Sequence, residues 1–169
     1  MSAPGAEEPP FIVVTEVADG AEFAEPIFQK KYRAAAPRHG RHLLAFYRGN
    51  EERWIAVSYL NYLPFRAAML IGGACTDGEV LRTLPEAPRR WIETNGGLML
   101  QLVRYGEARF AAESIGTFGH CGDARSWAVL SQCGYRRLDH PYLIVRWNRE
   151  PQGAARAELL AAVEAQGPF

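Results

Sequence analysis

The segment Glu93-Thr94-Asn95-Gly96-Gly97-Leu98-Met99-Leu100 joins a polar turn and two adjacent glycines to the start of an apolar stretch. The residues that follow, as far as Phe110, are apolar on most of a helical circumference. Gln101, Arg104 and Glu107 form a narrow polar stripe at helical spacing. Because a helix that is apolar on most sides is a buried helix, the segment predicts a helix that begins close to the core of the domain.

The start of this helix is a candidate binding site for an anion. The first-turn amides of a helix lack intrahelical partners, and the helix dipole favours negative charge at that end. Glycine also lets another group approach the backbone closely. Asn95, Gly96, Gly97 and Leu98 are therefore candidate phosphate-binding residues. An alternative interpretation stays open, in which Thr94 or Asn95 caps the helix and the glycines pack against a strand.

The composition narrows the class of protein. The chain has 169 residues and a formal net charge of zero, which suits one domain with a substantial core. The basic residues are scattered, so we expect no nucleic-acid partner. No apolar run reaches membrane-spanning length and the N-terminus does not resemble a signal peptide, so we expect no membrane partner and a cytoplasmic location.

Three cysteines are present, and they favour free buried thiols over disulfides. His120, Cys121, Cys133 and His140 could be drawn together as a zinc site, but their spacing matches no compact ligand pattern. We therefore expect no metal.

The order of the elements predicts the fold class. Residues 1–10 are rich in Pro, Gly, Ala and Glu and should be disordered. Hydrophobic periodicity and turn residues predict the remaining elements. The expected strands are 11–17, 43–47, 54–60, 67–75, 114–118, 135–138 and 142–147. The expected helices are 21–36, 97–110, 123–133 and 151–166, with short helical pieces near 80–81 and 89–91.

This order predicts an α/β domain over residues 11–148, with a mixed, mostly antiparallel central sheet and helices on both faces. Asn61 to Phe65 is expected to be a turn, and Gly72-Gly73 to mark a bulge or a splay. The helix that follows the glycine turn should cross over and make strands 67–75 and 114–118 parallel neighbours. Residues 149–169 would form a C-terminal helical tail that packs on this domain or on a partner.

At this point the chain resembles the GNAT acyltransferase superfamily, the acyl-CoA N-acyltransferase fold, over most of residues 11–148. The segment Asp123-Ala124-Arg125-Ser126-Trp127-Ala128-Val129-Leu130-Ser131-Gln132-Cys133-Gly134-Tyr135 is similar to the final helix of that family. Asp123 takes the place of its capping Asn, and Gly134-Tyr135 takes the place of its Gly-Phe pair.

The resemblance implies an acetyltransferase that takes acetyl-CoA, or another acyl-CoA, as co-substrate and a small-molecule or peptide amine as acceptor. It implies that Ala74, Cys75 and Thr76 form the strand edge that pairs with the pantetheine arm. It also implies that the turn from Asn95 to Leu98 holds the pyrophosphate, and that Asp123, at the start of the last helix, is a further cofactor-binding residue. A homodimer is possible.

The chain departs from the family pattern in three ways. The turn is Thr-Asn-Gly-Gly, without the family's Gln or Arg and its glycine spacing. The connection from Thr76 to Glu93 is longer than usual. Leu130 stands where many members carry a tyrosine that protonates the leaving thiolate. The first two departures bear on cofactor binding, and the third bears on the chemistry.

Asp77 and His120 follow the two strands of the expected cleft and are the candidate catalytic bases. Alternatively, Asp77 sets a turn with Gly78 and His120 is an ordinary loop histidine. Cys121 is not expected to be a nucleophile, since nothing nearby in sequence activates it. Two other classes of protein stay open: a non-catalytic GNAT-like acyl-CoA-binding or interaction domain, and an enzyme that uses a carrier-protein thioester, against which the balanced charge argues.

Overall fold

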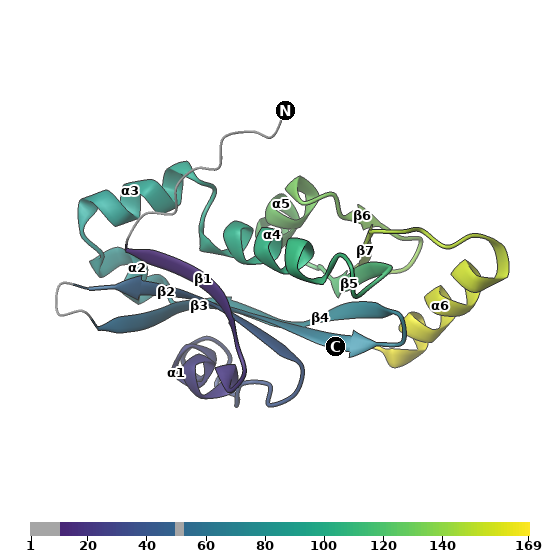
Figure 1. Cartoon of the computed structure of the whole chain (residues 1–169), viewed down its shortest axis with the longest axis horizontal. Coiled ribbons are helices and arrows are strands. Elements are labelled where there is room, and N and C mark those ends of the chain that lie inside the picture. The colour runs from purple at the N-terminus through teal and green to yellow at the C-terminus, as the bar shows by residue number, and fades with distance from the viewer. Residues whose placement is uncertain (1–10, 50–52) are drawn as a thin grey trace.

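A seven-stranded mixed sheet lies at the centre of the molecule, with helices on both of its faces (Figure 1). The computed structural model describes residues 11–49 and 53–169. The strand order is β1-β2-β3-β4-β5-β7-β6. The strands are β1 (Ile12–Val17), β2 (Arg41–Arg48), β3 (Trp54–Phe65), β4 (Ala68–Thr76), β5 (Gly116–His120), β6 (Arg136–Arg137) and β7 (Leu143–Trp147). The helices are α1 (Gly20–Tyr32), α2 (Gly78–Thr83), α3 (Glu86–Thr94), α4 (Leu98–Phe110), α5 (Ala124–Gln132) and α6 (Gly153–Gln166).

The pairing pattern confirms the predicted fold class. Strands β1 to β4 are joined antiparallel in chain order, and β5, β7 and β6 form a second antiparallel group. The two groups meet at β4 and β5, which are parallel. Helix α4 belongs to the crossover between these two strands, as the sequence predicts. The predicted disordered segment 1–10 lies outside the described residues.

Helix α4 forms the centre of one layer. Its side chains Leu102, Val103 and Phe110 are buried and pack in the same core cluster as Leu60 and Tyr62 of β3. Helices α3 and α5 lie in the same layer, above the sheet in Figure 1. Because α4 is enclosed by the sheet and its neighbours, the apolar surface seen in its sequence is accounted for.

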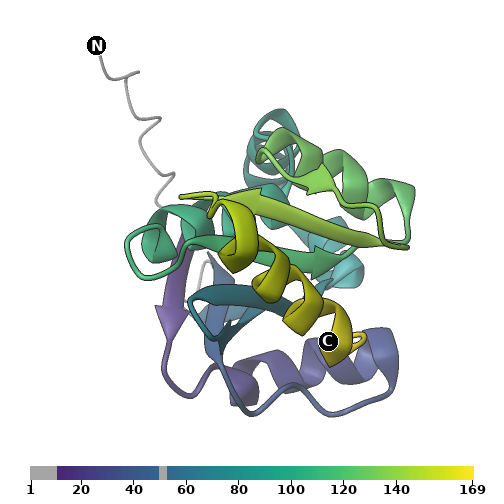
Figure 2. The same cartoon turned by 90° about the vertical axis from the view of Figure 1, so that its right-hand side faces the viewer.

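Helices α1 and α6 cover the opposite face of the sheet (Figure 1). Phe28 of α1 packs against Tyr59 of β3, with ring centroids 5.7 Å apart. The buried residues Leu159 and Val163 of α6 share a core cluster with strands β4, β5 and β7. Figure 2 shows α6 in the foreground, at the end of the molecule that lies on the right in Figure 1. The boundary predicted between a domain and a tail at residue 148 stays a prediction.

The turn predicted over Asn61 to Phe65 is wrong. Strand β3 continues to Phe65, which pairs with Ala68 of β4. The chain reverses at Arg66, whose backbone is left-handed at φ 52°. The apolar residues in the predicted turn pair with apolar residues of β4, for example Leu63 with Leu70, so cross-strand packing outweighs the turn signal of Pro64.

A β-bulge interrupts β4 at Gly72. Asn61 pairs with Gly73 and Tyr62 pairs with Ile71, so Gly72 is an extra residue in β4. A Cβ atom at this position would lie 2.7 Å from a methyl carbon of Leu63, closer than non-bonded atoms can approach. A larger residue would force the side chain of Leu63 to shift, so glycine suits this position, and the bulge predicted at Gly72-Gly73 is present.

Leu130 is the buried residue of α5 and should matter for stability. It is 9% exposed and packs in the same core cluster as Tyr135 and α4. We expect Leu130→Ala to lower the free energy of unfolding by roughly 2–5 kcal/mol, as for other buried leucines. Urea melts measure this loss. Ser131→Ala, an exposed neighbour on the same helix, is the control and should change stability by less than about 0.5 kcal/mol. An equal, small effect of both variants would contradict the packing role of Leu130.

Candidate functional site

The parallel strands β4 and β5 separate as they run toward their carboxyl ends. Their pairing register consists of Met69 with Thr117 and Leu70 with Phe118. Beyond these pairs β4 continues to Thr76, whereas β5 ends at His120. The two strands therefore form a V-shaped opening, and the edge of β4 after Leu70 faces that opening with backbone groups that β5 does not pair.

A cavity of about 860 Å³ lies along this edge. Its walls come from four parts of the chain: the last turn of α1, the end of β4 with the start of α2, the first turn of α4, and α5 with its cap. The lining residues are Ile27, Lys30, Lys31, Tyr32, Ala74, Cys75, Thr76, Asp77, Gly78, Glu79, Arg82, Met99, Asp123, Arg125, Ser126 and Val129. A cavity of this size can accept an elongated small molecule.

The three residues expected at the strand edge all line this cavity. The carbonyl oxygen of Ala74 accepts a hydrogen bond of 2.6 Å from the hydroxyl of Tyr32, the last residue of α1. The thiol of Cys75 is buried, and burial raises its pKa to about 12. The hydroxyl of Thr76 lies 2.6 Å from that of Ser58.

Asp77 also lines the cavity, but its carboxylate is already engaged. One oxygen accepts from the amides of Glu79 and Val80 and so caps α2. The other lies 2.8 Å from the ammonium of Lys30. Burial acts to raise the pKa of Asp77, but the bond from Lys30 and the two amides outweigh it, so the pKa lies below its ordinary value. These contacts describe a helix cap more than a general base, because a base needs a free lone pair and a pKa nearer neutrality.

The glycine turn is built differently from the expected phosphate-binding loop. The amides of Asn95, Gly96 and Gly97 donate to carbonyl oxygens of α3, the last of them to Ile92 at 2.8 Å. Gly96 has φ 80°, so the turn closes the end of α3 in the manner of a Schellman motif. Asn95 lines a separate cavity of about 530 Å³ on α3. The turn closes a helix because two short helices, α2 and α3, lie between β4 and α4. The sequence predicts these two helices only as short helical pieces.

The first turn of α4 does reach the main cavity. Gly97 occupies its N-cap position and has no side chain to accept from the first-turn amides. Leu98 and Leu100 point into the core, whereas Met99 lines the cavity. The amides at this end belong to a thirteen-residue helix, so its dipole adds partial positive charge beside the cavity.

Asp123 caps α5 at the opposite wall. Its carboxylate accepts from the amides of Arg125 and Ser126 at 3.0 and 2.9 Å. A hydrogen bond with the side chain of Ser126, followed by those from the two amides, holds the pKa of Asp123 below its ordinary value despite partial burial. The predicted cap is confirmed as local structure, and Gly134, with φ 84°, lies beyond the end of this helix as predicted.

His120 lies outside the cavity, on the face of the sheet that carries α6. Its ring packs against that of Phe169, with centroids 4.4 Å apart. Its Nδ1 atom is buried and has no hydrogen-bond partner within residues 11–49 and 53–169. Burial, assisted by the nearby His140, lowers the pKa of His120. The imidazole is therefore neutral at neutral pH and can accept a proton, but the two predicted catalytic residues are not brought together.

The three cysteines are free, as predicted. Burial raises the pKa of Cys121, whose thiol hydrogen-bonds the carbonyl oxygen of Asp123 at 3.6 Å. The thiol is thus poorly suited to act as a nucleophile. Among the described residues, no three His, Cys, Asp or Glu side chains gather in a way that could hold a metal ion.

The cationic and phenolic groups of α1 are the part of the site that sequence reasoning missed. Lys30, Lys31 and Tyr32 lie far from β4 in the chain and line the cavity only because α1 packs across the opposite face of the sheet. The sequence also predicts that this helix continues to Ala36, whereas it ends at Tyr32 because Arg33 adopts a left-handed conformation. Arg82 and Arg125 complete the cationic rim.

Comparisons with known proteins support the architecture. No family model matches the chain, and no curated protein matches it significantly. Among solved structures, a GNAT family acetyltransferase from Brucella melitensis in complex with acetyl-CoA has a TM-score of 0.51 at 14% identity, with 84% of this chain and 92% of that chain covered. A candidate acetyltransferase from Pyrococcus horikoshii has a TM-score of 0.53 at 12% identity; the match covers 81% of this chain but about half, 47%, of that longer chain.

A third neighbour corrects the prediction about partners. The KacTA–DNA complex contains a chain with a TM-score of 0.50 at 14% identity, and the match covers 89% of this chain and 99% of that chain. The prediction that nucleic acid is excluded is wrong, because a protein of this fold occurs in a complex with DNA. The scattered distribution of basic residues does not exclude a nucleic-acid partner, since a partner protein can supply contacts to DNA in a larger assembly.

In the described part of the chain, no helix combines the length and the apolar character needed to span a membrane. The structural neighbours share the overall fold of this chain, as their TM-scores of 0.51 and 0.53 show. The resemblance drawn from the sequence is confirmed at the level of structure: the chain has the fold of the GNAT acetyltransferases, with low sequence identity to them.

Proposed function

We propose that this protein transfers an acetyl or other acyl group from acyl-coenzyme A to an amine by direct attack. The observation that carries the proposal is the V-shaped opening between β4 and β5 with its cavity of about 860 Å³. The pantetheine arm would pair with the edge at Ala74, Cys75 and Thr76. The neighbour from Brucella melitensis, described in complex with acetyl-CoA, supports this choice of co-substrate.

The proposed pyrophosphate position is the first turn of α4, from Leu98 onward. Asn95, Gly96 and Gly97 precede this first turn of α4, and their amides already donate to carbonyl oxygens of α3. They would therefore border the pyrophosphate without donating hydrogen bonds to it. Lys30, Lys31 and Arg125 on the rim would add positive charge for the phosphates. Asp123 would act through the cap of α5, which positions the neighbouring Arg125.

His120 is the better supported of the two candidate bases. Its neutral imidazole suits proton removal from an acceptor ammonium through a water molecule, since the unpartnered Nδ1 is buried and out of direct reach of the acceptor. Asp77 is proposed only as a positioning residue, since it joins Lys30 to the start of α2. An amine acceptor would approach His120 from the face that carries α1 and α6. The cytoplasmic location stays a prediction.

A second candidate function is a non-catalytic acyl-CoA-binding or interaction domain. Two observations favour it. Leu130 occupies the position of the family's tyrosine, and the amides of the glycine turn already donate hydrogen bonds to carbonyl oxygens of α3. The first test below separates the two candidates, because only an enzyme releases free thiol.

We expect the wild-type protein to release free thiol from acetyl-CoA when a suitable amine is present, with no covalent acyl-enzyme. Thiol release is followed with a chromogenic reagent across a panel of amines. Cys121→Ser should keep the rate within a few-fold, because the buried thiol with its raised pKa takes no part. Mass spectrometry after incubation with acetyl-CoA alone should find no acetyl group on Cys121. A stoichiometric adduct that disappears on adding amine would contradict direct transfer, and binding without thiol release for any amine would favour the second candidate.

A further inference from the structure

The hydroxyl of Tyr32 reaches the unpaired edge of β4 from the other side of the sheet. Tyr32 is the last residue of α1, and its ring packs on that of Phe28 with centroids 4.9 Å apart. Its hydroxyl donates to the carbonyl oxygen of Ala74 at 2.6 Å. The side chain is 49% exposed overall and lines the main cavity. A phenol is therefore held at the strand edge while its surroundings stay open to a ligand.

Of the β4 residues that line the cavity, Ala74 is the nearest in sequence to Leu70, where β4 and β5 still pair. A chain-like ligand that enters between the strands can advance only as far as the point where they meet. On the proposed function, the pantetheine arm lies along this edge, so its reactive sulphur end comes nearest to Ala74 and hence to the hydroxyl of Tyr32.

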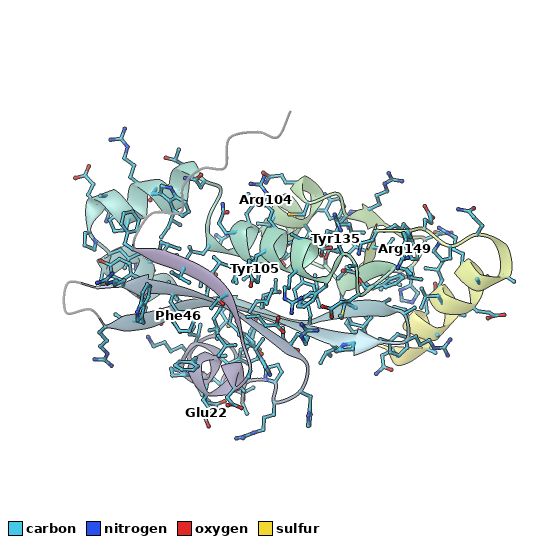
Figure 3. The ribbon with its side chains drawn as sticks, in the orientation of Figure 1. Glu22, Phe46, Arg104, Tyr105, Tyr135 and Arg149 are labelled. Atoms are coloured by element: carbon cyan, nitrogen blue, oxygen red, sulfur yellow. The ribbon has the colours of Figure 1, made fainter. Side chains whose placement is uncertain are left out.

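Three buried tyrosines, Tyr59, Tyr62 and Tyr135, have hydroxyls that are engaged elsewhere. The hydroxyl of Tyr59 lies 2.8 Å from Nδ1 of the buried His42. The hydroxyls of Tyr62 and Tyr135 both donate to the carboxylate of Glu107, between α4 and the sheet. Figure 3 labels Tyr135 in this layer, away from α1. Tyr32 is the tyrosine among the residues that line the cavity.

We propose that Tyr32 donates the proton that the departing coenzyme A thiolate requires. This inference rests on the proposed function. The amine nitrogen bonds to the carbonyl carbon of the thioester and the carbon–sulphur bond breaks, with its electron pair going to sulphur. The thiolate takes the proton of the Tyr32 hydroxyl. The proton lost from the amine passes to a base or to water, and the phenolate regains a proton from solvent. The step thus converts amine and thioester into amide and thiol.

The surroundings of Tyr32 suit this role. Burial, with the neighbouring groups Cys75 and Asp123, raises the pKa of Tyr32 above its ordinary value. The phenol is therefore protonated throughout the neutral range, so its proton is available to the thiolate, while the raised pKa makes it a weaker acid than an ordinary tyrosine. Because α1 carries it from a different part of the chain, it can serve the thiolate although the family's tyrosine position on α5 is Leu130.

The test is Tyr32→Phe, measured with two small acetyl donors in addition to acetyl-CoA. Removing a general acid usually lowers the rate by a factor of about 10²–10⁴. Because a thiolate is a good leaving group, the loss expected here lies at or below the low end of this range. We expect kcat with acetyl-CoA to fall roughly 10- to 100-fold, with KM within about threefold. The same loss in kcat/KM should appear with S-acetyl-N-acetylcysteamine, an alkyl thioester. It should vanish with 4-nitrophenyl thioacetate, whose acidic thiol leaves without protonation.

Tyr105→Phe is the matched control. This half-buried tyrosine belongs to α4, where Figure 3 labels it, and it is not among the residues that line the cavity. It should leave all three rates unchanged, and thermal melts should find both variants folded. Equal losses for Tyr32→Phe with the alkyl and the aryl thioester would show a structural role and overturn the inference. Wild-type rates in Tyr32→Phe would overturn it as well and leave the acyltransfer proposal intact. Failure of the wild type to release thiol from any donor would overturn both.

Discussion

Replacing Glu107 by alanine is expected to lower the free energy of unfolding by about 3–5 kcal/mol, the range for removing one partner of a buried ion pair. Glu107 is 5% exposed and lies in α4 against the sheet. Its carboxylate accepts from the guanidinium of Arg146 at 2.7 Å and from the hydroxyls of Tyr62 and Tyr135. The variant leaves a charge and two buried phenols without their acceptor, and each such group costs desolvation energy.

The network joins parts of the fold that lie far apart in sequence. Tyr62 comes from β3, Tyr135 from the turn after α5, and Arg146 from β7, and all of them meet at one residue of the crossover helix. The sheet groups on either side of the V-shaped opening are thereby tied to α4. Loss of Glu107 should therefore loosen the opening as well as lower stability.

Glu107→Gln is the matched control of the same shape without charge: its amide oxygen can still accept from Arg146, and its NH2 group can donate to the hydroxyl oxygens of Tyr62 and Tyr135. Its cost should be less than half that of alanine, measured by urea melts at neutral pH. Burial raises the pKa of Glu107 despite the bonds from Tyr135 and Arg146. A carboxyl group with a raised folded-state pKa contributes stability that is present at low pH and is lost as the pH rises through that pKa. This contribution should disappear from the pH profile of both variants. A loss below 1 kcal/mol for alanine would show that the network does not hold the layers together.

The architecture was predictable because its signals are local. The β-branched strands, the apolar surface of α4 and the Asp123 cap with Gly134 at the end of α5 each specify an element from neighbouring residues. Their order then implies the crossover between β4 and β5. The one clear error in the strands, at Asn61 to Phe65, arose where a proline signalled a turn but cross-strand pairing decided the structure.

The site was predictable only in part, because its contacts are not local. Ala74, Cys75, Thr76 and Asp123, which are candidate cofactor-binding residues, line one cavity, and their role in binding stays a prediction. The ion pair between Lys30 and Asp77 and the hydrogen bond between Tyr32 and Ala74 depend on how α1 packs over the sheet. No periodicity in a single sequence encodes that packing, so the engagement of Asp77 could not be foreseen.

The glycine turn illustrates the same limit. Two glycines before a buried helix fit a phosphate-binding loop and a helix C-terminus equally well, since both require positive φ. The choice between them depends on whether a helix precedes the turn. Proline residues at 85 and 88 obscure α3 in the sequence, although a proline can stand in or just before the first turn of a helix.

The expected consequence for the proposed cofactor site is that Met99→Glu abolishes binding of coenzyme A. Met99 lies in the first turn of α4 and lines the main cavity. A carboxylate there would stand in front of the first-turn amides, where the pyrophosphate is proposed to lie. Two unit charges about 4 Å apart repel by about 4 kcal/mol near a protein surface. We therefore expect affinity to fall at least 100-fold, which corresponds to about 2.7 kcal/mol.

The substitution separates binding from folding, because an acidic residue in the first turn favours a helix. Met99→Glu should melt at or above the wild-type temperature without ligand and should lose the upward shift that coenzyme A gives the wild type. Met99→Gln is the control of equal size without charge and should keep the shift. Titration calorimetry then measures the affinities directly. If Met99→Glu binds coenzyme A as tightly as Met99→Gln, the phosphates do not lie at the first turn of α4, and the cationic rim formed by Lys30, Lys31 and Arg125 becomes the site to vary next.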